Sequence, residues 1–187
     1  MSRVYLAVIG LFFAHSLAAQ GMVVRPEPPL DANRATLRDA LLRFRDSLNS
    51  IDAAASRLQR DYREASTASL TSRARVMHAA CARSARNLPP TRQAVLVADA
   101  SDERRLRRRG EMVAALHQLQ KALARCERDF AVMSRPGEGE RVRGYGNDRA
   151  VRAQAALRQY ERVLGAFTST MNIKVAPLGA KPPPVAG

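Results

Sequence analysis

Apolar residues recur at alternating steps of four and three positions along most of the chain, the heptad pattern of helices that bury one stripe. The first stripe follows Asp31, a residue suited to capping a helix N-terminus. Its members are Leu37, Leu41, Phe44, Leu48, Ile51, Ala55, Leu58 and Tyr62. The Ser/Thr-rich stretch 66–72 weakens helix propensity, so we expect a break there; one long helix with a stutter is the alternative.

A second stripe predicts a helix over about residues 70–88. Its members are Leu70, Ala74, Met77, Cys81, Ala85 and Leu88. Pro89 and Pro90 then predict a stop or a sharp kink, because proline lacks an N–H group and clashes with the preceding turn. Residues 92–98 are predicted to form a short helix beyond the prolines, with a buried strand as the alternative.

Two further stripes follow. Ser101, with Asp102 and Glu103 after it, predicts the start of a third helix, and Asn147 is expected to cap a fourth after a Gly-rich loop over 134–146. The third stripe comprises Leu106, Met112, Leu116, Leu119, Leu123, Cys126, Phe130 and Met133. The fourth comprises Ala153, Leu157, Tyr160, Leu164, Phe167 and Met171. We therefore predict an all-α fold, an antiparallel bundle of about four heptad-patterned helices with a kinked second arm.

The N-terminal residues 1–19 do not follow this pattern. A cationic start is followed by an almost unbroken apolar run over 4–13 and then by small residues, which is typical of a secretory signal peptide. Cleavage after Ala18 fits best, and cleavage after Ala19 or Gln20 is the alternative. A retained membrane anchor is the other interpretation, although the run is shorter than the roughly 20 residues of a span.

The remaining boundaries follow from proline and glycine. Residues 20–30 are expected to form a Pro-rich extended lead, and the bundle is expected to occupy residues 31–172. Residues 173–187 contain a Pro/Gly-rich stretch and are expected to be a disordered tail. Together these predictions describe an exported protein of the periplasm or extracellular envelope, tethered to the membrane if the N-terminal segment is not cleaved.

Export changes the meaning of the two cysteines, Cys81 and Cys126, because an even count in an exported chain indicates a disulfide. If the chain turned directly after Leu88, the two residues would lie about 10 Å and about 36 Å from the turn at helical rise. Bonded cysteines need Cα atoms within roughly 7 Å. A second arm that continues past the prolines to about Asp99 brings the two distances to about 27 Å and 36 Å. We therefore predict this longer arm and a Cys81–Cys126 bridge.

Charge is the other strong feature, with a formal net charge of +14 at pH 7. A basic chain usually indicates nucleic acid, but an exported protein does not meet a genome, so we expect anionic lipid head groups or acidic protein surfaces instead. Arginine offers two-pronged contacts to phosphate and carboxylate. The candidate docking residues are Arg104, Arg105, Arg107, Arg108, Arg109, Arg141, Arg143 and Tyr145. The alternative is a surface that only keeps the protein soluble.

No motif predicts catalysis or a cofactor. The chain has no Cys-x-x-Cys-His sequence for haem attachment and no Gly-x-Ser-x-Gly turn for a nucleophilic serine. The predicted register places His78 and His117 far apart, which argues against a shared metal site. We therefore expect no enzyme activity, no metal and no cofactor.

The sequence as a whole predicts a non-enzymatic exported scaffold or accessory subunit that docks an acidic or membrane-associated partner in the cell envelope. The alternatives are a periplasmic chaperone-like binder of unfolded proteins and a small redox or metal carrier. Leu70 and Thr71 begin the Leu-Thr-x-x-Gln motif of small periplasmic chaperones, but Ala74 stands at the glutamine position. The heptad seams could also pair between chains and form a homo-oligomer.

Overall fold

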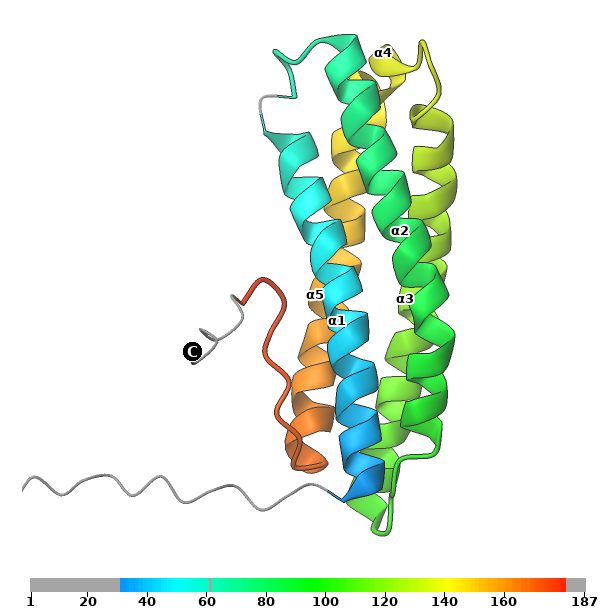
Figure 1. Cartoon of the computed structure of the whole chain (residues 1–187), viewed down its shortest axis with the longest axis vertical. Coiled ribbons are helices and arrows are strands. Elements are labelled where there is room, and N and C mark those ends of the chain that lie inside the picture. The colour runs from blue at the N-terminus through cyan, green and yellow to red at the C-terminus, as the bar shows by residue number, and fades with distance from the viewer. Residues whose placement is uncertain (1–30, 61, 181–187) are drawn as a thin grey trace, which may run out of the picture.

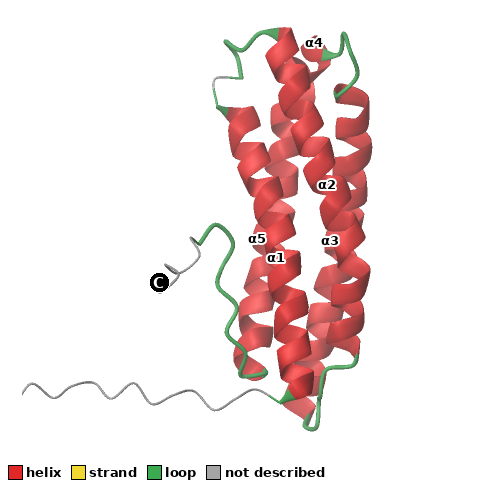
Figure 2. Ribbon diagram, viewed as in Figure 1, coloured by secondary structure: helices red, strands yellow, loops and turns green. Residues whose placement is uncertain are grey.

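A computed structural model of the chain describes residues 31–60 and 62–180. Within these ranges the chain is helical and contains no strand (Figure 2). The elements in chain order are α1 (Ala32–Gln59), α2 (Thr67–Leu96), α3 (Glu103–Met133), the short α4 (Gly139–Arg141), the π-helical turn η1 (Val142–Gly146) and α5 (Asn147–Thr170). The expected signal peptide at 1–19 and the Pro-rich lead at 20–30 lie outside the described residues.

The four long helices form an antiparallel bundle (Figure 1). α1 and α3 run in one direction and α2 and α5 in the other. α2 packs against α1 and α3, and α5 packs against α3 and α1, so the four helices enclose one shared core. The predicted all-α fold and the antiparallel bundle are confirmed.

The core consists of the predicted stripes. In α1 the stripe members from Leu37 to Leu58 are all buried. The ring of Phe44 meets the ring of Tyr160 on α5 edge to face, with the centroids 5.7 Å apart. Three other stripe members, Tyr62, Ala85 and Ala153, are only partly buried. Leu106 at the start of α3, predicted as a core residue, is 49% exposed.

The break between the first two helices is confirmed, but it comes earlier than predicted. α1 ends at Gln59, and α2 begins at Thr67 rather than near residue 70. Ser66 caps α2, because its hydroxyl accepts a hydrogen bond from the backbone N–H of Ser69 at 3.2 Å. A serine that weakens a helix interior thus marks a helix start here.

Pro89 and Pro90 lie inside α2, and both are exposed. The predicted stop at these residues and the separate short helix over 92–98 are wrong, because α2 continues to Leu96 as one helix. The prolines remove two intrahelical hydrogen bonds on the solvent side. Core packing on the opposite face carries the helix past them, through Leu88, Thr91, Ala94 and Val95. The predicted extension of the second arm is therefore confirmed.

The connection before α5 also differs from its prediction. Residues 134–138 form turns, but residues 139–146 are helical and lead into α5 without a break, so Asn147 is not a helix cap. Gly139 is buried against Thr67, where an added Cβ would lie about 2.5 Å from that residue's atoms. The glycine allows close packing between helices, whereas the sequence pattern indicates a loop.

The start of the predicted disordered tail is bound to the bundle. Residues 173–180, at the red end of the chain in Figure 1, run back along α1 and α5. The buried Arg45 of α1 donates a hydrogen bond to the Pro177 carbonyl at 3.3 Å. The Leu178 N–H donates to the Glu161 carboxylate of α5 at 2.8 Å. Side chains of the helices thus bind the backbone of this segment, a contact that composition does not reveal; residues 181–187 lie outside the described residues.

Candidate functional site

The two cysteines meet between α2 and α3. Cys81 and Cys126 form a disulfide with their Cα atoms 6.0 Å apart, and both are buried. The same register places the Arg109 guanidinium 3.1 Å from the Ala98 carbonyl, to which it donates a hydrogen bond. The predicted pairing and register of the two arms are confirmed. The bond crosslinks two helices within the core.

The predicted arginine docking residues do not form one surface. Residues 104–109 lie at the end of the bundle where α2 connects to α3, whereas Arg141, Arg143 and Tyr145 lie at the opposite end, beside α4. α3 spans 31 residues between these ends, a length of about 46 Å. A single compact partner site cannot include both groups.

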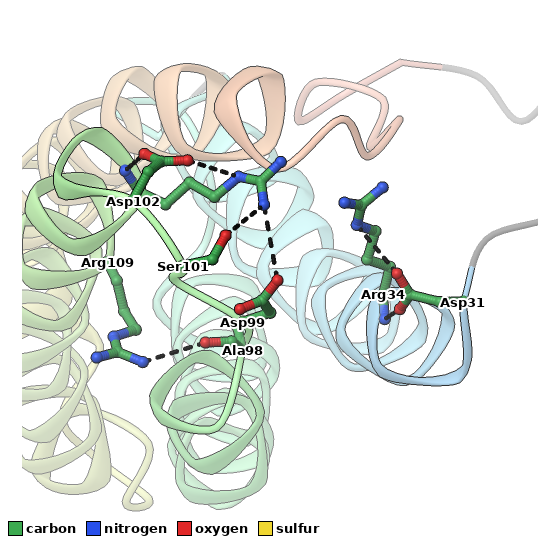
Figure 3. Close-up of polar contacts among 8 residues, drawn as sticks. Asp31, Arg34, Ala98, Asp99, Ser101, Asp102 and Arg109 are labelled. Carbon is green, nitrogen blue, oxygen red and sulfur yellow. Dashed lines mark hydrogen bonds and ion pairs between the residues drawn. The ribbon is translucent and has the colours of Figure 1, made fainter.

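Two of these arginines hold the α2–α3 connection in place (Figure 3). Asp102, rather than Ser101, caps α3 by accepting from the Arg105 backbone N–H at 2.8 Å. The Arg105 guanidinium pairs with Asp102 at 3.4 Å and Asp99 at 3.6 Å. Arg109 donates to the backbone carbonyl of Ala98. These contacts use both guanidinium groups within the protein.

Three more of the predicted docking residues are also engaged. Arg108 and Arg141 each pair with a glutamate three residues away, at 2.7 Å and 3.1 Å. Arg143 donates to the backbone carbonyls of Arg63 at 2.6 Å and Ala65 at 2.9 Å, and so joins η1 to the α1–α2 connection. The interpretation of these residues as free anion ligands is therefore weakened. Tyr145 is 61% exposed.

Arg104 and Arg107 are the members of the group that are exposed and make no ion pair or hydrogen bond with the described residues. Three exposed apolar side chains, those of Leu96, Val97 and Leu106, lie at the same end of the bundle. Leu106 precedes Arg109 by one turn of α3, and Arg109 donates a hydrogen bond to the Leu96 carbonyl. We call these five residues, Leu96, Val97, Arg104, Leu106 and Arg107, the basic tip.

α1 begins at the same end of the bundle as the basic tip. Asp31 caps α1 by accepting from the backbone N–H of Arg34 at 2.8 Å. Figure 3 shows Asp31 at the same end as Ala98 and Asp102. The chain that precedes residue 31 therefore joins the bundle at this end.

A second candidate surface is a groove along the side of the bundle between α3 and α5, with a volume of about 730 Å³. Small side chains line much of it, and we call it the α3–α5 groove. Its alanines are Ala114, Ala115, Ala122, Ala153, Ala155 and Ala156. The heptad pattern does not predict the groove, because it places Ala153 in the core. Helix spacing alone does not show that small residues from two helices face each other.

Charged residues border the α3–α5 groove. Arg149 of α5 pairs with Asp129 of α3 at 3.4 Å, across one end of the groove. Lys121, Arg125 and Arg152 line it as well, are exposed, and make no ion pair or hydrogen bond with the described residues. The groove therefore combines an apolar floor with unneutralised positive charge.

The described residues show no other chemistry-bearing arrangement. No three His, Cys, Asp or Glu side chains among them gather as a group that could hold a metal ion. None of their helices has the length and apolar character needed to cross a membrane. Comparison of the chain with protein-family models, curated proteins and solved structures finds no match. The basic tip and the α3–α5 groove are therefore the two candidate surfaces of the described residues.

Proposed function

We propose that the protein is a non-enzymatic, exported helical scaffold or accessory subunit that docks an acidic, membrane-associated partner in the cell envelope. The observation that carries the proposal is the basic tip, where two exposed arginines without a partner among the described residues lie at the same end of the bundle as three exposed apolar side chains. Arg104 and Arg107 suit phosphate and carboxylate groups. Leu96, Val97 and Leu106 suit the apolar layer beneath lipid head groups or the centre of a protein interface.

Two further features support the proposal. Disulfides such as Cys81–Cys126 persist in oxidising compartments, which favours export. The chain before residue 31 joins α1 at the same end of the bundle as the basic tip, so an N-terminal tether would bring that end to the membrane surface. A tip held there gains effective concentration for an anionic partner.

The test is co-sedimentation of the chain from residue 20 onward with phosphatidylcholine vesicles, with and without added phosphatidylglycerol. We expect sedimentation only with the anionic lipid. Replacing both Arg104 and Arg107 with glutamine should weaken it by about tenfold or more, because each basic residue near an anionic surface contributes about 1 kcal/mol.

The matched control replaces Arg128 and Arg135 with glutamine, because both are exposed, make no side-chain ion pair or hydrogen bond with the described residues, and lie toward the other end of α3. This variant has the same net charge and should keep most of the binding. Equal losses in the two double variants would mean that net charge alone drives sedimentation and would reject the tip as the docking surface.

The scaffold and chaperone interpretations differ in the partners they require. Crosslinking in intact envelopes, followed by purification, should recover one partner complex at fixed stoichiometry. Recovery of many unrelated unfolded proteins, with suppression of their aggregation in solution, would favour the chaperone-like alternative instead.

A further inference from the structure

We infer that the α3–α5 groove binds an acidic amphipathic helix of a partner protein. This inference goes beyond the proposed function, because it concerns the side of the bundle and not the basic tip. It rests on the proposed function only for the premise that the protein has a partner. Shape, side-chain size and charge each support it.

The shape of the groove suits a third helix. Its lining extends along α3 from Glu111 to Asp129, and α5 runs antiparallel beside it from Arg149 to Val163. Eighteen steps along α3 correspond to about 27 Å, which matches a helix of about 18 residues. A long groove between two helices lying side by side is a geometry that binds the apolar face of a peptide helix.

Alanines make up much of the floor of the groove, together with the buried Leu119 and Tyr160. Ala115 and Ala122 are seven residues apart on α3, and Ala153 and Ala156 face them from α5. A small void of about 10 Å³ is lined by the last three alanines. Leucine side chains at positions i, i+3, i+4 and i+7 of a docked helix would act as knobs in these holes.

Charge selects the flanks of the docked helix. Lys121, Arg125 and Arg152 line the groove and have no ion-pair or hydrogen-bond partner among the described residues, so glutamates or aspartates beside the leucine stripe would meet them. A second copy of this groove would instead bring the same cations together. A single acyl chain would remain partly in water, because the groove is open along its side. These arguments favour an acidic helix over both other occupants.

The probe for the test is a capped synthetic peptide of about 18 residues with leucines at helical i, i+3, i+4 and i+7 spacing and glutamates on the flanks. Binding to the chain from residue 20 onward is measured by fluorescence anisotropy at physiological salt. We expect saturable binding. A peptide of the same composition with the stripe scrambled, and one with lysine in place of glutamate, should each bind at least about tenfold more weakly.

Paired variants locate the binding site. Replacing Lys121, Arg125 and Arg152 with glutamine should weaken binding of the acidic peptide by about tenfold or more. A control that replaces Arg83, Arg86 and Arg128 with glutamine removes the same charge outside both the groove and the basic tip, and should change binding by less than about threefold. All six side chains are exposed, so both variants should retain the fold.

A groove-filling variant, Ala115→Leu, tests shape at constant charge. It should weaken binding of the acidic peptide while circular dichroism remains unchanged. The inference is overturned if the scrambled peptide binds equally well, if the two triple variants lose binding equally, or if Ala115→Leu has no effect. Such a result would leave the vesicle experiment on the basic tip unaffected, and a failed vesicle experiment would leave this one intact.

Discussion

At the scale of single residues, Tyr160 is the most unusual member of the core. Its side chain is fully buried, and its hydroxyl has no hydrogen-bond partner among the described residues. A buried donor without a partner destabilises a fold by about 1–3 kcal/mol. The ring itself is well packed, edge to face on Phe44. The packed ring of Tyr160 stabilises the fold, whereas its buried hydroxyl destabilises it.

Tyr160→Phe should therefore leave the free energy of unfolding unchanged or raise it by about 1 kcal/mol. Urea denaturation followed by circular dichroism at neutral pH measures this value. Tyr145→Phe, on an exposed ring, is the control and should have no effect. A loss of stability in Tyr160→Phe would show that the hydroxyl has a partner, such as a buried water.

The same residue predicts a dependence on alkaline pH. Burial raises the pKa of the Tyr160 phenol well above its ordinary value of 10, so the unfolded chain loses this proton first. The neutral phenol's contribution to stability is complete below about pH 10 and decreases as the pH rises further, by up to about 1.4 kcal/mol per unit. Denaturation curves between neutral and strongly alkaline pH should show this decrease, and Tyr160→Phe should reduce it.

At the scale of elements, the helical run 139–146 depends on close packing at two glycines. An added Cβ at Gly139 would lie about 2.5 Å from Thr67, and one at Gly146 would lie 2.9 Å from the Val142 side chain. Gly144, in the same run, has nothing within 4 Å of such an atom. Gly139 and Gly146 thus leave no room for a side chain, whereas Gly144, a few residues away, does.

We expect Gly139→Ala to lower the free energy of unfolding by about 1–3 kcal/mol, because the backbone of α2 at Thr67 must shift. Gly144→Ala should be neutral or stabilising by up to about 1 kcal/mol, since alanine is the better helix former and has room. Thermal melts of the two variants provide the comparison. Equal effects would mean that the α4–α2 contact is not tight.

Sequence reasoning at this scale succeeded where a residue's local preference and its packing agree. Asp31 favours a helix start, and α1 begins after it. It failed at Pro89 and Pro90, because the buried residues around them keep the helix continuous. Local helix propensity does not include the free energy of this packing. It also failed for residues 173–180, whose backbone partners come from α1 and α5.

At the scale of the whole molecule, the disulfide is the strongest single constraint. Cys81 and Cys126 are 45 residues apart in sequence, and closing a loop of that size stabilises the folded state by about 4 kcal/mol through the lost entropy of the unfolded chain. The bond joins α2 to α3, so it also fixes the register of the second and third helices.

Reduction with dithiothreitol, or replacement of both cysteines with alanine, should lower the free energy of unfolding by about 4 kcal/mol and leave the helical circular dichroism spectrum largely intact. The remaining core still holds four helices together. Urea titrations with and without reductant measure the difference. No change on reduction would mean that the protein, as isolated, contains free thiols.

The sequence by itself determined the fold class, the heptad stripes and the pairing of the cysteines. Each of these follows from local spacing or from distances along a helix, so no knowledge of distant neighbours was needed. The sequence also showed where the arginines are concentrated. It did not show which of them are available for binding, because charge along the chain does not reveal which side chains already have partners.

Only the tertiary structure decided which charges remain available. Residues more than 30 positions apart form ion pairs or hydrogen bonds only after the helices pack. Arg143, for example, donates hydrogen bonds to backbone carbonyls of the α1–α2 connection. Packing likewise left Leu106 exposed in the basic tip and brought alanines from α3 and α5 together in one groove. A surface depends on what packing leaves uncovered, and the pattern of one helix cannot specify that.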